Sequence, residues 1–136
     1  MLVQPYLNFD GRCEEALNFY RKALGAEVLM LTRMKDNPEA KAEMIPPGRQ
    51  EKVLHASFRI GETTVMASDC ACTGQSTFQG FSLSIAARDE AQADRLFAAL
   101  SDGGQVRMPL TSTFFSPRFG MLADRFGVSW MLIVPQ

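Results

Sequence analysis

Hydrophobic and polar residues along the first third of the chain follow two different periods. Residues 3–9 alternate between apolar and polar side chains, which is typical of a strand with one buried face. Residues 12–24 carry apolar side chains at helical spacing, and the predicted helix stops at Gly25, where a left-handed residue often closes a helix. Residues 26–33 predict a second strand. The chain is therefore expected to begin with strand, helix, strand.

The remainder of the first half predicts a hairpin between two long connections. Residues 53–60 and 63–69 read as strands joined by a tight turn at Gly61. Residues 36–52 are polar and rich in proline, so they form either a binding loop or a solvated insertion. Residues 70–79 are small and polar without periodicity, which predicts a linker.

The same pattern starts again after this linker. Residues 81–86 alternate like a strand, and residues 89–100 carry an apolar helical stripe that ends at two glycines. Three more strands are expected, the last two joined by a Gly turn: 105–110, 114–123 and 128–134.

The two halves also align with each other. A shift of 78 residues superimposes three identical pairs, Phe19 with Phe97, Gly25 with Gly103 and Val28 with Val106, while a shift of 65 superimposes the two hairpins. The excess length of the first half falls in the 36–52 loop. We therefore predict a single domain, residues 1–136, built of two βαβββ modules, 1–75 and 76–136.

Composition narrows the classes of partner. The chain has 136 residues and a formal net charge of -1, and its Lys and Arg residues are scattered, so neither nucleic acid nor an anionic membrane surface is expected as a partner. No apolar run is long enough to span a bilayer, and no secretory signal is visible, which favours a cytoplasmic protein. Cys13, Cys70 and Cys72 do not have the spacing of a zinc knuckle or a redox motif, and we expect reduced thiols.

Several of these segments resemble one protein family. Residues 5–11, followed by 15–20 and Leu24-Gly25, resemble the opening of the vicinal-oxygen-chelate superfamily, which holds glyoxalase I, bleomycin-resistance proteins and extradiol dioxygenases. Four further segments are similar to its PhnB-like branch: 54–56, 59–61, 66–69 and 124–131. The resemblance covers nearly the whole chain. It implies an α+β fold in which two βαβββ modules form curved mixed sheets around a cleft, usually in a homodimer.

The metal ligands of that superfamily have no counterpart here. The resemblance places the usual ligand positions on Pro5, Met66, Phe81 and Met131. Proline and phenylalanine have no donor atom, and a thioether suits Cu(I) rather than the ions of this chemistry. The single histidine also excludes a site with two His ligands. We expect no metal and no cofactor.

Members of this branch are often labelled demethylubiquinone methyltransferases. No Gly-rich loop follows a first parallel strand, as a methyl-donor nucleotide would require, so the sequence does not favour that activity.

An apolar cleft is the ligand site that these residues predict. Its expected lining is Pro5, Leu7, Met66, Phe81 and Met131, a profile typical of a small-molecule pocket. The alternative is that the same residues pack as the core of a narrower cleft.

Polar candidates come from one strand and one hairpin. His55, Ser57 and Arg59 share a strand face; if it lines the cleft, Arg59 can bind a carboxylate or phosphonate and His55 can act as a base or donor. Otherwise they form a solvated face or a dimer contact. Arg118 and Asp124 flank the last hairpin, where a salt bridge or turn cap competes with a ligand clamp.

Two functions remain open from the sequence. The first is a metal-free small-molecule-binding protein of the glyoxalase/bleomycin-resistance type. The second is a lyase or related enzyme of the same superfamily, using a relocated metal or acid–base chemistry by His55 and Arg59. The sequence identifies neither the ligand nor a reaction.

Overall fold

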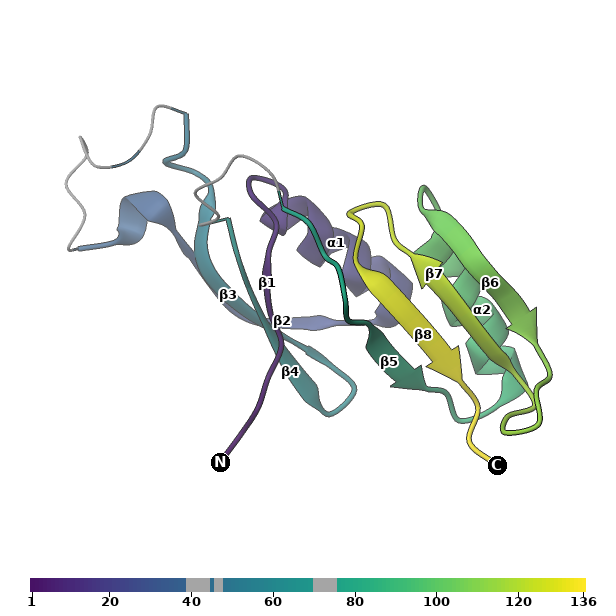
Figure 1. The fold of residues 1–136 in the computed structure, drawn as a ribbon. Helices are drawn as coiled ribbons and strands as arrows, with labels where there is room; N and C mark the ends of the chain where they lie inside the picture. The colour runs from purple at the N-terminus through teal and green to yellow at the C-terminus, as the bar shows by residue number, and fades with distance from the viewer. Residues whose placement is uncertain (39–44, 46–47, 70–75) are drawn as a thin grey trace. The chain divides into compact units, whose positions relative to one another are not determined.

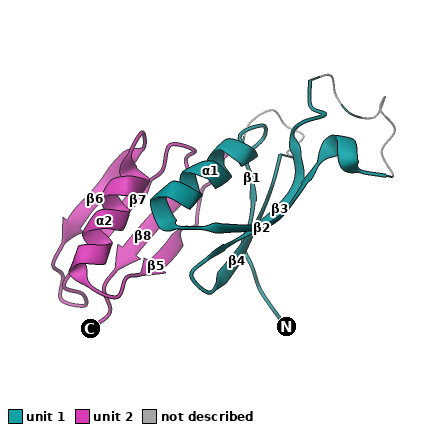
Figure 2. Ribbon diagram, turned by 180° about the vertical axis from the view of Figure 1, so that it is seen from behind, with its two compact units in different colours: residues 1–76 teal, residues 77–136 magenta. Residues whose placement is uncertain are grey.

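The computed structural model describes residues 1–38, 45, 48–69 and 76–136. The chain consists of two compact units, unit 1 (residues 1–76) and unit 2 (residues 77–136), shown in different colours in Figure 2. The elements of unit 1 are β1 (Tyr6–Asn8), α1 (Cys13–Leu24), β2 (Glu27–Arg33), the short 3-10 helix η1 (Met34–Asp36), β3 (Val53–Ile60) and β4 (Thr63–Ser68). Those of unit 2 are β5 (Leu83–Ala86), α2 (Glu90–Ser101), β6 (Gln105–Thr111), β7 (Phe119–Ala123) and β8 (Ser129–Ile133).

Unit 1 is a four-stranded sheet covered by α1 on one face. Its strand order is β1-β4-β3-β2, with β1 parallel to β4 and the other pairs antiparallel (Figure 1). Helix α1 ends at Gly25, whose φ of 68° is the left-handed conformation that glycine adopts without strain. Tyr20 of α1 stacks on Phe58 of β3, with ring centroids 5.8 Å apart. This contact identifies the face of the sheet that α1 buries.

Unit 2 repeats this arrangement. Its strand order is β5-β8-β7-β6, with β5 parallel to β8, and α2 lies in front of the strands in Figure 2. The carboxylate of Asp89 caps α2 by accepting a hydrogen bond from the backbone N–H of Gln92 at 2.8 Å. A Cβ at Gly120 of β7 would lie 2.8 Å from the ring of Phe97, so this face of β7 is in close contact with α2.

The predicted fold class is confirmed, because each unit has the order strand, helix, three strands and the two sheets are mixed. Two predicted strands were too long. The strand expected at 114–123 is only Phe119–Ala123, because Thr113 and Ser116 close a turn in which the Thr113 N–H donates to the Ser116 carbonyl at 2.8 Å.

The strand expected at 3–9 is reduced to Tyr6–Asn8. Flanking it, the Pro5 carbonyl accepts from the N–H of Met66 and the N–H of Phe9 donates to Ser68. Residues 39–44, 46 and 47 of the 36–52 loop and residues 70–75 of the 70–79 linker, including Cys70 and Cys72, lie outside the described residues. Within the described part of the chain, no helix is long and apolar enough to cross a membrane.

Candidate functional site

The face of the unit 1 sheet opposite α1 carries a row of four side chains. Strand register places Met30 opposite Ser57, Ser57 opposite Met66, and Met66 opposite Tyr6. Because Phe58 faces α1, its neighbour Ser57 faces the other way, and so do its cross-strand partners. We call Met30, Ser57, Met66 and Tyr6 the unit 1 row. Tyr6 is 47% exposed and Met30 44% exposed, so this row is open to solvent in the single chain.

Unit 2 has a matching row on the face opposite α2. Met108 lies opposite Met121, Met121 opposite Met131, and Met131 opposite Ser84. Gly120 faces α2, so Met121 and its partners face away from the helix. All three methionines are half-buried. These four residues form the unit 2 row.

The two rows occupy corresponding positions in the repeated sheets. The edge strands β2 and β6 each contribute a methionine just after a register shift, Met30 and Met108. The strands parallel to β1 and β5 contribute Met66 and Met131. The repeat therefore preserves a thioether at these two places on each open face, while the remaining positions differ in size and polarity.

A polar pair adjoins the unit 1 row. The hydroxyl of Tyr6 lies 3.1 Å from Nδ1 of His55, and the two ring centroids are 5.6 Å apart at an interplanar angle of 30°. Tyr6 comes from β1 and His55 from β3, and both strands neighbour β4. His55 is the single histidine of the chain. The pair therefore adds a phenol and an imidazole to a row whose other members are two methionines and the hydroxyl-bearing Ser57.

Arg59 shares the open face with His55, as the alternation predicted, but its charge is balanced. Its guanidinium forms an ion pair with the carboxylate of Glu27, directly opposite on β2. The sequence left open whether Arg59 binds an anionic ligand or belongs to a solvated face. An anionic ligand would have to compete with Glu27, because the antiparallel β2–β3 register brings that acidic residue opposite Arg59.

Within each unit, the apolar residues predicted to line the cleft have different surroundings. Leu7 is 2% exposed, and its place on β1 beside Tyr6 puts it on the α1 face, away from Met66. Pro5 precedes β1 and contributes its carbonyl to the sheet. Phe81 precedes β5 and is 45% exposed. Of the predicted apolar set, Met66 and Met131 are the members that lie on open faces.

The last hairpin uses its charged residues structurally. Nε of Arg118 lies 3.1 Å from the carboxylate of Asp94 on α2, which is a salt bridge. Asp124 is 3% exposed, and its Oδ1 accepts hydrogen bonds from the N–H groups of Phe126 and Val128 at 2.8 and 3.1 Å. Both the salt bridge and the turn cap anticipated for this hairpin are present.

A divalent metal does not fit the residues at the superfamily's ligand positions. Pro5 and Phe81 lack donor atoms, and Met66 and Met131 offer only soft thioethers. Among the residues with described structure, no group of three or more His, Cys, Asp and Glu side chains converges as a metal site would require.

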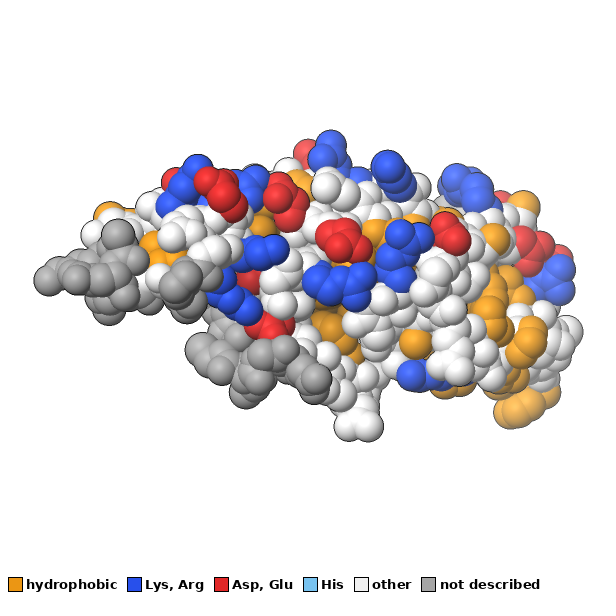
Figure 3. Space-filling model, turned by 90° about the horizontal axis from the view of Figure 1, so that it is seen from above, with side chains coloured by type: hydrophobic (Ala, Val, Ile, Leu, Met, Phe, Trp, Pro, Cys, Tyr) orange, Lys and Arg blue, Asp and Glu red, His pale blue; other side chains and the backbone are white. Residues whose placement is uncertain are grey.

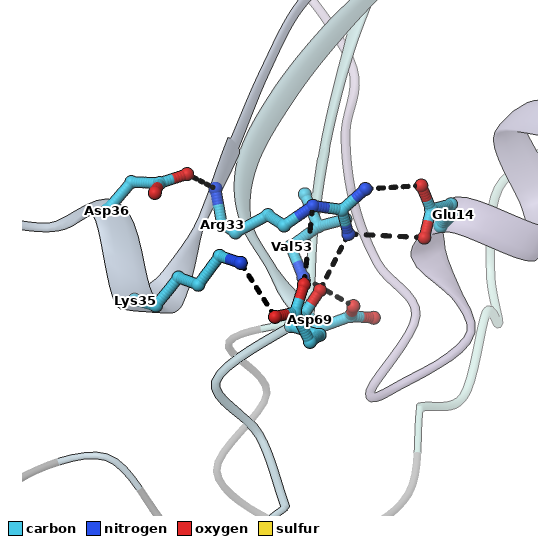
Figure 4. Close-up of polar contacts among 7 residues, drawn as sticks. Glu14, Arg33, Lys35, Asp36, Val53 and Asp69 are labelled. Atoms are coloured by element: carbon cyan, nitrogen blue, oxygen red, sulfur yellow. Dashed lines mark hydrogen bonds and ion pairs between the residues drawn. The ribbon is translucent and has the colours of Figure 1, made fainter. Parts of the chain in front are cut away.

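A second polar cluster lies near the N-terminus of α1 and serves the fold. Oδ1 of Asp69 accepts from the N–H groups of Gly11 and Cys13 at 2.6 and 2.9 Å, and Oδ2 accepts from Val53 N–H at 3.0 Å. Figure 4 shows the nearby bidentate pair between Arg33 and Glu14, with distances of 3.2 and 2.7 Å. These hydrogen bonds lower the pKa of Glu14 and raise the pKa of Arg33.

One face of the molecule shows a mixed charged surface (Figure 3). Lys and Arg side chains alternate with Asp and Glu side chains on the face seen in Figure 3. Such a mixed surface lacks the concentrated positive charge that a polyanion needs.

Sequence reasoning missed five residues of the open faces: Tyr6, Met30, Ser84, Met108 and Met121. Tyr6 carried a usable signal, because it alternates with the buried Leu7 and Phe9 on β1. Met30 and Met108 carried none, since each follows a register shift that changes which residues share a face.

Known proteins resemble the chain over its whole length. Protein YjdN of Escherichia coli is 34% identical over 98% of this chain and 95% of its own. The crystal structure of PA1353 from Pseudomonas aeruginosa is similar with a TM-score of 0.86 and 37% identity, covering 100% of this chain and 98% of that one. The PhnB protein from Bacillus cereus has a TM-score of 0.81 and 31% identity, covering 98% and 99%.

A family profile described as 3-demethylubiquinone-9 3-methyltransferase matches residues 2–133. Together with the repeated βαβββ units, these matches show that the chain belongs to that family, of which the PhnB protein is one similar member.

Proposed function

We propose that this protein binds a small, partly apolar molecule on its open sheet faces and that binding needs no metal. The observation that carries the proposal is the pair of methionine-bearing rows, each on the face that its helix leaves uncovered. A flexible, polarisable thioether adapts to irregular apolar ligands. Full burial of one such side chain contributes roughly 1.5–3 kcal/mol, so covering two or three of them supports useful affinity.

A second copy of the chain is part of this proposal. The half-buried methionines leave apolar surface of each open sheet face in contact with water. Pairing with another copy of the chain removes that surface from water, which favours association. We place the ligand on a face that becomes enclosed in a homodimer. Light scattering of the protein as it elutes from a size-exclusion column measures its oligomeric state. A strict monomer that binds the ligand with full affinity would contradict the proposed homodimer. We also propose the cytoplasm as the site of action, because the spacing of the three cysteines does not form a disulfide framework.

Methyl transfer from a nucleotide donor is not the function we propose, although the family's description names it. A donor of that type needs a Gly-rich turn between a parallel strand and a helix. The turn between β1 and α1 contains the single glycine Gly11, and the turn between β5 and α2 contains none.

Acid–base catalysis is the second candidate, favoured by the contact of Tyr6 with His55. An imidazole held by a phenol 3.1 Å away is a competent proton acceptor or donor for a molecule lying on the unit 1 row. Arg59 is less suited to the role once expected of it, because Glu27 already pairs with its charge.

The binding proposal is tested with a neutral apolar fluorophore, N-phenyl-1-naphthylamine, titrated against the whole protein. Met66→Glu and Met131→Glu each place a charge on one open face, and Val106→Glu changes a residue that is already 45% exposed. We expect at least one face variant to weaken binding by about tenfold or more, the equivalent of 1.4 kcal/mol, with Val106→Glu unchanged. Unsaturable binding by the natural protein, or equal affinity in all variants, would overturn the proposal.

A further inference from the structure

We infer that Tyr6 and His55 together form the hydrogen-bonding end of the unit 1 face, and that its ligand is an uncharged molecule with a carbonyl or hydroxyl oxygen beside an apolar part. This inference rests on the proposed binding function. It adds the chemical class of the ligand and names the two side chains that recognise its oxygen.

The first argument is the orientation of the imidazole. The Tyr6 hydroxyl lies 3.1 Å from Nδ1 of His55, so that nitrogen is already engaged. A neutral imidazole has one donor and one acceptor nitrogen, and the partner of one nitrogen sets the role of the other. When the phenol donates to Nδ1, the proton resides on Nε2. The structure gives Nε2 no partner among the described residues, so it is left to bond a ligand.

The second argument is that the pair adapts to either kind of oxygen. With the phenol donating, Nε2–H donates to a carbonyl oxygen. With the phenol accepting from Nδ1–H, Nε2 accepts from a hydroxyl. A hydroxyl group can rotate between these roles without moving the ring. A fixed cation would not have this freedom, and it would select an anion.

The third argument is the charge of the surrounding face. The side chains directly opposite or beside the pair are neutral: Thr32 lies opposite His55, and Ser57 and Met66 belong to the same row as Tyr6. Arg59, the cation on the same strand face, is paired with Glu27. On the strand positions named here, the one cation is already paired, so a carboxylate would lose its hydration without gaining a free positive partner. The face therefore favours an uncharged ligand.

The fourth argument is the spacing of polar and apolar groups. Met66 adjoins Tyr6 on the neighbouring strand, and Met30 lies two strands from Met66 across Ser57. Neighbouring strands are about 4.8 Å apart, so the methionines flank an area about the width of one six-membered ring. A ring that packs between them can carry its oxygen toward His55.

The single histidine makes this testable by NMR without other assignments. In the free protein labelled with 15N-histidine, Tyr6→Phe removes only the hydroxyl and should move the Nδ1 signal. Tyr20→Phe, on the buried side of α1, serves as the matched control. An Nδ1 signal unaffected by Tyr6→Phe would overturn the inference, because the phenol would not be holding the ring.

Four small probes then define the ligand class: acetophenone, 4-methylphenol, toluene and benzoate. We expect acetophenone and 4-methylphenol to shift the Nε2 signal saturably, and Tyr6→Phe to weaken them by about fivefold to tenfold, the effect of one hydrogen bond. Toluene should bind through the methionines without moving Nε2. Toluene binding with no response of His55 to the oxygen-bearing probes would refute this inference and leave the binding function standing. Tighter binding of benzoate than acetophenone would also refute it, and failure of all four probes to bind would refute both.

Discussion

Oδ2 of Asp124 accepts a hydrogen bond from the indole Nε1–H of Trp130, 2.8 Å away, within the last hairpin of the chain. The other oxygen of the same carboxylate holds two backbone N–H groups of the turn. One buried carboxylate therefore joins the turn to β8, and β8 carries Met131 on its open face. The geometry of the unit 2 row depends on this anchor.

Asp124→Asn should destabilise the protein by about 2–3 kcal/mol, because an amide nitrogen replaces one acceptor in a buried site that faces three donors. Urea unfolding measures the change. Asp102→Asn is the matched control, since that carboxylate pairs with Arg125 on the surface with 78% of its side chain exposed, and should cost less than about 0.5 kcal/mol. Equal effects of the two substitutions would show that Asp124 does not anchor the hairpin.

Asp69 makes a parallel prediction for unit 1. Its carboxylate holds the N–H groups of Gly11, Cys13 and Val53, so Asp69→Asn should accelerate amide hydrogen exchange at those residues. The amides of Phe126 and Val128, which bond to Asp124, are the internal reference and should exchange as in the natural protein. Unchanged protection at Gly11 and Cys13 would contradict the assignment.

The Glu14–Arg33 pair predicts a pH dependence. Hydrogen bonding to Arg33 lowers the pKa of Glu14 below its ordinary value of 4.5, so the unfolded chain binds a proton at a higher pH than the folded one. The contribution is fully present above that value and disappears as the pH falls through the lower folded pKa.

Glu14→Gln should therefore lower the melting temperature at neutral pH and have no effect in strong acid. Because 51% of the Glu14 side chain is exposed, the effect should be small and should shrink with added salt. Glu62→Gln, in the exposed β3–β4 turn, is the control. A stability difference that grows on acidification would contradict the sign.

Gly104 predicts a steric effect in unit 2. A Cβ there would lie 2.2 Å from the backbone carbonyl oxygen of Ala123, which cannot move without disturbing β7. Gly104→Ala should cost about 1–3 kcal/mol or more by overpacking. Gly61→Ala is the comparison: its φ is +57° but the space around it is open, so it should cost only about 1 kcal/mol. Thermal unfolding that ranks Gly61→Ala as the more damaging change would contradict the geometry.

Local patterns in the sequence predicted the helices well. The predicted helices 12–24 and 89–100 correspond to Cys13–Leu24 and Glu90–Ser101, because apolar spacing and stop signals are local properties. The two Gly-centred hairpins were likewise expected and are present.

The candidate site was predicted less well, because it depends on pairing between distant segments. The parallel pairing of β1 with β4 puts Tyr6, not Leu7, beside Met66. The resemblance alone had placed Leu7 in the lining beside Met66, whereas Leu7 lies on the α1 side of β1. Likewise, only the β2–β3 register shows that Glu27 neutralises Arg59. Alternation alone put His55 and Arg59 on one strand face, and whether that face binds a ligand stays a prediction.

The most direct test of the central claim is elemental analysis combined with native mass spectrometry of the protein purified without chelator or a metal-affinity tag. We predict no divalent metal near stoichiometric amounts. We also predict a dimer whose measured mass equals that of two chains, either alone or with a small organic molecule bound. Mn, Fe, Ni or Zn at one equivalent per chain, lost together with ligand binding on treatment with EDTA, would contradict the metal-independent account.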